Sequence, residues 1–285
     1  MDGTAHPGET AHPGEEDRIP LRAGDACATV APRDGGRLAS LVIDGRELLV
    51  TDSESLYGWG AFPMVPYAGR IRHGRLRFRG RTYELPRTMP PHAIHGTLAD
   101  VAWQVTGVPA DDGAVLSAAL HAPWPFRGRV VERFRLEPTA LHIELEVDAE
   151  EPMPAWVGWH PWFRRHVEGA TGELELSIRP GRMYARDGEG IPTGATVPPS
   201  SRPWDDVFED LPAAPRLRWP GYLQLDVESE CRYWVIYDEQ PHAICVEPQT
   251  GPPDAANWLP EDAVLVGPGR PLRAMMTLRW APDEG

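Results

Sequence analysis

Apolar and polar residues alternate over short stretches along most of this chain, with the period of two that is typical of β-strands. Residues 75–79 show this most clearly, because Leu76 and Phe78 stand between three arginines. A turn at Gly80 leads into a second apolar run over residues 82–85. The segment therefore predicts a hairpin that covers Leu76 and Phe78 and leaves the arginines in solvent.

Similar short runs recur to the end of the chain, bounded by turn residues such as the Asp44-Gly45 dipeptide. We find no convincing run with a period of 3.6. Regular short strands separated by turns favour an all-β fold, a large antiparallel β-sandwich. The other predicted strands are residues 27–31, 38–50 (two runs), 101–105, 115–120, 130–136, 141–147, 173–178, 223–227, 234–237, 243–247 and 273–280.

The N-terminal segment is a direct repeat, in which residues 4–9 and 10–15 are identical. It is small, polar and proline-bearing, so it buries too little apolar area to offset its ordering entropy. We predict a disordered tail over residues 1–20 and a single domain over residues 21–285, because no shift in composition marks a boundary. Residues 180–220, rich in proline, glycine and arginine, are expected to be a long irregular excursion over the sheet.

Composition narrows the class of partner. Apolar residues make up 41% of the 285 residues, which is enough for a core, and the net charge of −14 argues against nucleic acid or an anionic membrane. Three cysteines without metal-type spacing favour free thiols in a reducing cytoplasm. Neither a signal peptide nor a spanning apolar run is visible. We expect a monomer or weak homodimer that binds a small molecule.

Residues 159–163, Trp-His-Pro-Trp-Phe, hold one ionisable imidazole, His160, between two indoles. Pro161 stiffens the backbone beside it, and an unperturbed imidazole titrates near ~6.5, so it can exchange a proton near neutral pH. Trp159 or Trp162 could stack on the apolar face of a sugar. The alternative is a buried core histidine in an aromatic cluster.

A second candidate group is the carboxylate of Glu247, near the end of a predicted strand. Alternation along residues 243–247 puts Ala243, Cys245 and Glu247 on one face, where two small side chains leave space beside the carboxylate. The turn residues that follow would end the strand, so we expect Glu247 at a strand mouth. The alternative is an edge-strand glutamate in water.

Other segments add polar groups without a recognisable metal or nucleotide site. Residues 62–70 are apolar, contain two prolines and end in Arg70, which can be presented to a polar ligand. His92 and His95 are three apart, but no third zinc ligand can be identified, so no metal is predicted. There is no glycine-rich phosphate loop, nucleophile elbow or Cys–His nucleophile pattern.

Taken together, six stretches resemble the aldose 1-epimerase (galactose mutarotase) family over about residues 25–280, and one of them, Trp-Pro-Phe-Arg-Gly, resembles a bacterial epimerase-like subgroup. The resemblance implies a galactose mutarotase-like supersandwich that binds a free monosaccharide in an open cleft on one sheet, without cofactor or metal. The stretches, in order, are FPMVPYAGRIRHG (62–74), AIHG (93–96), PWPFRG (123–128), GWHPWF (158–163), WDDVF (204–208) and VEPQTG (246–251).

The resemblance also implies the chemistry. His160 matches the family's general acid and Glu247 its general base, so the activity implied is interconversion of α and β anomers by ring opening and closure. An acid and a base on opposite sides of the cleft are expected to suffice.

The same resemblance implies contacts to the sugar. His95 matches a histidine that hydrogen-bonds near the ring oxygen, and Arg70 matches an arginine that contacts hydroxyls. Gly69 stands where the family has asparagine, so one polar contact is missing. Asp205 matches the sugar-binding aspartate, with the adjacent Asp206 as the alternative.

Three other functions fit parts of the pattern. A hexose-6-phosphate 1-epimerase would need cations around the phosphate, for which Arg72 and its neighbours are available. A non-catalytic carbohydrate-binding sandwich would keep the pocket without turnover. A glycoside hydrolase would use Glu247 and Asp205 as paired carboxylates.

Overall fold

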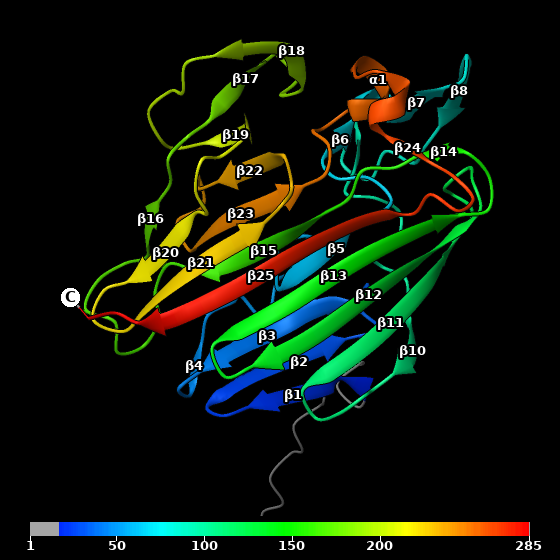
Figure 1. Cartoon of the computed structure of the whole chain (residues 1–285). Helices are drawn as coiled ribbons and strands as arrows, with labels where there is room; N and C mark the ends of the chain where they lie inside the picture. The colour runs from blue at the N-terminus through cyan, green and yellow to red at the C-terminus, as the bar shows by residue number, and fades with distance from the viewer. Residues whose placement is uncertain (1–16, 285) are drawn as a thin grey trace, which may run out of the picture.

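The computed structural model describes residues 17–284, which fold into two large antiparallel sheets packed face to face (Figure 1). This confirms the predicted all-β sandwich. Short two-stranded sheets and a few helical turns cap one end. These are β6 (Arg70–Ile71) with β9 (Ala93–Ile94), β7 (Arg75–Phe78) with β8 (Arg81–Glu84), β14 (Met153–Pro154) with β24 (Leu265–Val266), α1 (Ala255–Trp258), and 3-10 turns over Arg72–Gly74 and Glu261–Ala263.

The first sheet, called here the large sheet, has eleven strands within residues 17–284. Its centre is formed by strands from distant parts of the sequence. In spatial order they are β1 (Ile19–Ala23), β2 (Ala26–Ala31), β3 (Arg37–Ile43), β5 (Ala61–Met64), β15 (Gly158–Arg164), β23 (Ala243–Gln249), β22 (Tyr233–Tyr237), β19 (Asp205–Glu209), β17 (Arg182–Arg186) and β18 (Pro192–Val197), with β4 (Arg46–Glu47) paired to β3.

The second sheet, the small sheet, has eight strands in the same described range. Its longest strands, β12, β13 and β25, lie in front of the large sheet in Figure 1. In spatial order the strands are β10 (Gln104–Gly107), β11 (Gly113–Leu120), β12 (Gly128–Glu137), β13 (Ala140–Ala149), β25 (Leu272–Pro282), β21 (Leu223–Ser229), β20 (Arg216–Trp219) and β16 (Glu175–Ser177).

The core lies between the two sheets and follows from the alternation of each strand. On β13, Ile143 and Leu145 are fully buried, and on β23, Ile244 and Val246 are buried to the same degree. Trp159 of β15 reaches across the core, where its indole Nε1 donates to Glu132 of β12 at 3.0 Å. One connected set of buried apolar side chains runs from β1 to β25.

Both predicted hairpins are confirmed. Asp44 and Gly45 join β3 to β4 with φ of 46° and 75°, the left-handed pair that a two-residue hairpin turn requires. Strands β7 and β8 pair as expected, with Leu76 and Phe78 buried and the alternating arginines exposed. No helix in residues 17–284 has the length and apolar character needed to cross a bilayer.

Three predicted boundaries are wrong. Strand β1 begins at Ile19, so the predicted tail over residues 1–20 runs into the first strand, while residues 1–16 lie outside the described residues. Strand β10 covers 104–107 rather than 101–105. The expected irregular excursion over 180–220 contains β17 to β20. Sequence pattern misses these last strands because β18 is an exposed edge with proline and glycine, and β19 begins with two aspartates.

Candidate active site

A cavity of about 520 Å³ opens on the face of the large sheet that is turned away from the small sheet. Its size lies within the range of ordinary small-ligand sites. Of the seven site residues predicted from the sequence, all but Trp159 line this cavity. The six are Arg70, His95, His160, Trp162, Asp205 and Glu247.

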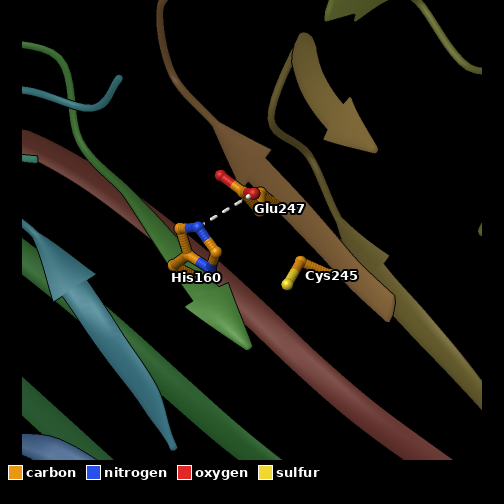
Figure 2. Close-up of side chains that lie close together, drawn as sticks. All are labelled: His160, Cys245 and Glu247. Atoms are coloured by element: carbon orange, nitrogen blue, oxygen red, sulfur yellow. Dashed lines mark ion pairs between the residues drawn. The ribbon is translucent and has the colours of Figure 1, made fainter. Parts of the chain in front are cut away.

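The register of two neighbouring strands brings His160 and Glu247 together (Figure 2). Strands β15 and β23 are antiparallel and pair Gly158 with Gln249 and Trp162 with Cys245, which places residues 160 and 247 opposite each other. His160 Nε2 lies 3.3 Å from Glu247 Oε1. The two groups are therefore side by side at the base of the cavity, and the expectation that they lie on opposite sides of a cleft is wrong.

Glu247 is neither at a strand mouth nor at an edge. Strand β23 continues to Gln249 and is flanked by β15 and β22, so the carboxyl is only 2% exposed. Gln249 Nε2 donates to Glu247 Oε2 at 3.2 Å. The expectation of a solvated edge glutamate is therefore wrong, because the sequence does not show which strands will flank β23.

Burial decides the charge of this pair. It lowers the pKa of His160 to about 3, with a further lowering by the buried guanidinium of Arg37. Burial also raises the pKa of Glu247 well above its ordinary value, and the negative charge of Asp205 adds to this. Both effects have the same cause, since a charged group in a dry site lacks the solvation of water. Burial therefore favours a neutral imidazole and a protonated carboxyl over the ion pair.

Two parallel rings hold the imidazole of His160. Phe62 of β5 stacks on the ring with a centroid distance of 5.0 Å, and Trp162 stacks on it at 5.2 Å. The His242 ring also stacks on the Trp162 indole, with a centroid distance of 6.0 Å and an interplanar angle of 5°. Trp162 lines the cavity with both imidazoles stacked on it, and its contact with a sugar stays a prediction.

Trp159 belongs to the core. It is fully buried and points to the opposite face of β15, because neighbouring side chains on a strand alternate. Its indole nitrogen is bonded to Glu132 of the small sheet. The prediction that Trp159 contacts substrate is wrong, and its role is to pack one sheet against the other.

His95 stands at the edge of the pair. Its ring meets the His160 ring edge-on with centroids 5.1 Å apart, and its Nδ1 has no hydrogen-bond partner within residues 17–284. Burial, together with His160 and Arg70, lowers the pKa of His95 well below the ordinary value, so the ring is neutral. Gly96 has φ of 83°, and a Cβ there would lie 1.9 Å from the carbonyl oxygen of Val65. Only glycine lets the chain turn here and present His95 to the cavity.

A chain of alternating charges forms one wall. Arg70 Nη2 lies 3.7 Å from Asp205 Oδ2, and Arg186 Nη1 lies 3.2 Å from the same oxygen. Arg186 Nε also contacts Asp206 at 2.8 Å. Asp205 lines the cavity, whereas Asp206 does not, so the first of the two aspartates is the one placed to meet a ligand.

Sequence reasoning missed several residues that line the cavity. Arg186 comes from β17, a strand that was not predicted, and no sequence signal pointed to it. Gln249 could have been found by extending the alternation of residues 243–247 by one step, because it shares the face of Glu247. The other lining groups with polar side chains that were missed are Ser53, Ser55, Tyr57, Tyr237, Glu239, Gln240 and His242.

The described residues contain one group of three side chains with metal-binding atoms close together, formed by His160, Cys245 and Glu247. His92 and His95 do not form such a group in residues 17–284. The His92 Nδ1 instead accepts from the backbone N–H of His73 at 3.1 Å.

Comparison with solved structures identifies the fold. The fold matches a galactose mutarotase-like protein from Clostridium acetobutylicum with a TM-score of 0.80 and 19% identity, covering 93% of this chain and 95% of that one. It matches the galactose 1-epimerase from Lactobacillus acidophilus with a TM-score of 0.75 and 16% identity, covering 92% and 93%. The chain thus has the galactose mutarotase-like β-sandwich fold.

The sequence identifies the family. Residues 17–264 match the model of the family described as Aldose 1-epimerase, and the chain belongs to that family, as the six stretches predict. Membership implies an epimerase. The chain is 31% identical to the uncharacterized protein YphB of Escherichia coli K12 over 243 residues, which cover 76% of this chain and 82% of YphB. It is 24% identical to the uncharacterized protein YihR of the same organism, covering 91% and 92%.

Proposed function

We propose that the protein interconverts the α and β anomers of a free aldose by proton transfer at the anomeric hydroxyl and the ring oxygen. The observation that carries the proposal is the 3.3 Å contact between His160 and Glu247 at the base of a cavity of about 520 Å³. The hydroxyl oxygen and the ring oxygen are both bonded to C1 of an aldose. An acid and a base that serve both oxygens must therefore be neighbours.

The reaction needs one proton removed and one delivered. Following the family resemblance, Glu247 takes the proton of the C1 hydroxyl while His160 gives a proton to the ring oxygen. The C1–ring oxygen bond breaks, an aldehyde forms, and rotation about C1–C2 before closure gives the other anomer. The pair must first move its one proton from Glu247 to His160, over the existing contact. The hydrogen bond from Gln249 Nε2 supports the carboxylate form of Glu247.

Other groups lining the cavity are suited to hold the sugar. Arg70 and Asp205 offer charged donors and acceptors to its hydroxyls. His95 is neutral and has an unpartnered Nδ1 among the described residues, so it can exchange a hydrogen bond with a neutral oxygen. A sugar that accepts these contacts would displace the water from this end of the cavity.

The charge of the cavity favours a free sugar over a phosphosugar. Its two arginines, Arg70 and Arg186, already face Asp205, and Glu239 adds another carboxylate to the lining. Arg72 is paired with Asp187 and Glu189 and does not line the cavity. A phosphate in this cavity would meet carboxylates. Among the described residues, each arginine that lines the cavity already has an acidic partner.

The decisive test is an NMR measurement of anomer exchange over a panel of free hexoses and pentoses together with glucose 6-phosphate. At least one free aldose should exchange faster than the buffer background, and glucose 6-phosphate should not. Glu247→Gln, which keeps the shape of the side chain, serves as the matched control and should slow exchange by about 10²–10⁴-fold. Sugars that bind in calorimetry without faster exchange would instead support a non-catalytic carbohydrate-binding sandwich.

A further inference from the structure

Cys245 adds a third ligand atom to the histidine and glutamate of the proposed acid–base pair (Figure 2). Its Sγ, a ring nitrogen of His160 and a carboxylate oxygen of Glu247 all lie within 4.8 Å of one another. Cys245 stands two residues before Glu247 on β23, so both side chains share one face of the strand. All three residues are buried.

We propose that these three side chains form a binding site for Zn²⁺ that inhibits the protein. A nitrogen, a thiolate and a carboxylate are the donors that Zn²⁺ takes, and three protein ligands with one open position are a recurrent arrangement. Bond lengths of about 2.0–2.3 Å place tetrahedral ligands roughly 3.5 Å apart. His160 and Glu247 are already at 3.3 Å. Only the Cys245 thiol, which is fully buried, has to move closer.

Charge balance favours a divalent cation at this place. A buried cation needs compensating charge, because the dry site offers no water shell. The thiolate of Cys245 and the carboxylate of Glu247 supply two negative charges, and the neutral imidazole adds none. The Cys245 thiol and the Glu247 carboxyl each release their proton as the metal binds, because both ligands must be deprotonated. Mg²⁺ prefers oxygen ligands and would not replace Zn²⁺ here.

A second feature of His160 suits metal binding. Its Nδ1 is buried and has no hydrogen-bond partner among residues 17–284. The ring is aimed by stacking between Phe62 and Trp162 rather than by a hydrogen bond. Nε2 faces Glu247 Oε1 at 3.3 Å, so this nitrogen already lies toward the position that the metal would take, and metal binding would replace the contact between the two groups.

The consequence for activity rests on the proposed function. The lone pairs that would hold Zn²⁺ are those that exchange protons with the sugar, so metal and anomer exchange exclude each other. Zn²⁺ would act as a reversible inhibitor. Binding of the metal itself does not depend on the protein being an epimerase.

The binding test uses the full chain with Zn²⁺ alone in calorimetry and with Co²⁺ alone in absorption spectroscopy. The wild type should bind Zn²⁺ and show a cobalt–thiolate charge-transfer band in the near ultraviolet. Cys245→Ser should lose the band and bind Zn²⁺ at least about tenfold more weakly. Removing a group that only hydrogen-bonds to a metal ligand already lowers metal affinity by about tenfold or more, so loss of a ligand should cost at least as much. Equal Zn²⁺ affinity in the wild type and Cys245→Ser, or no thiolate band in the wild type, would overturn the proposal.

The matched control is Cys231→Ser, which removes a partly buried thiol that does not line the cavity. It should behave as the wild type in both measurements. The tail histidines His6 and His12 are common to all variants, so binding at the tail cancels. Cys245→Ala provides a second variant if the serine protein does not fold, with circular dichroism as the check.

An activity test separates this proposal from the proposed function. Zn²⁺ should inhibit anomer exchange in the wild type, a chelator should restore it, and Cys245→Ser should need at least about tenfold more Zn²⁺ for the same fractional inhibition. If no aldose exchanges, the proposed function fails while the cobalt band still decides the metal site. If exchange is present but Zn²⁺ does not inhibit it, the inhibitory site fails and the epimerase stands.

Discussion

The proposed pair should act as one unit, and a double-mutant cycle tests this directly. His160 and Glu247 are in contact at 3.3 Å and share one proton, so removal of either leaves the other without its partner. General acid or base catalysis contributes about 10²–10⁴-fold. Glu247→Gln and His160→Asn should therefore each slow anomer exchange by about 10²–10⁴-fold, or about 2.7–5.5 kcal/mol.

The double variant gives the sharper result. Independent groups would multiply their losses to about 10⁴–10⁸-fold, whereas groups that act as a unit leave the double variant about as active as either single one. The assay is NMR exchange between anomers of the aldose found active, with the uncatalysed rate subtracted. Near-multiplicative losses would refute the shared proton, and full activity in either single variant would remove that residue from the mechanism.

The control for this cycle makes the same chemical change elsewhere. Glu132→Gln also replaces a buried carboxyl, but it lies on β12 of the small sheet and does not line the cavity. Its exchange rate should equal that of the wild type. Circular dichroism and thermal unfolding of all four variants would confirm that the losses are not caused by unfolding.

Three further predictions concern the pH dependence of the pair, the stacking of Trp162 and the buried carboxyl of Glu132. Burial lowers the pKa of His160 to about 3 and raises that of Glu247, so the pair keeps one proton as the pH falls. We therefore expect kcat/KM not to fall between pH 7 and pH 5. A fall in that range would contradict the shared proton. Trp162→Leu should lower kcat more than it raises KM, because Trp162 stacks on the imidazole of His160. Steady-state exchange kinetics would measure both constants, and a rise in KM larger than the fall in kcat would indicate that the indole binds sugar instead. Burial raises the pKa of Glu132 well above the ordinary value. The contribution of its neutral carboxyl to the free energy of unfolding is therefore complete below pH ~4.3, the pKa in the unfolded chain. It declines as the pH rises toward the raised pKa, by up to about 1.4 kcal/mol per pH unit. In urea unfolding, the stability of Glu132→Gln relative to the wild type should therefore rise from pH 5 to pH 8, and a constant difference would refute this.

Much of the fold could be predicted from the chain alone. The alternation of Leu76 and Phe78 with arginines and the Asp44-Gly45 turn are local signals, because strand period and turn geometry depend on neighbouring residues. Six short stretches in order identified the family, and with it six of the residues that line the cavity. These features do not depend on which strands become neighbours.

Only the tertiary structure decided how the site works. The register between β15 and β23 sets His160 beside Glu247, and pairing between distant strands is not encoded in any local period. Flanking strands bury the carboxyl and raise its pKa, which favours the proton on Glu247 rather than on His160. Arg186 enters the site from a strand without a sequence signal. Long-range pairing determines solvation, and solvation determines protonation, so the chemistry of this site depends on contacts that no stretch of sequence contains by itself.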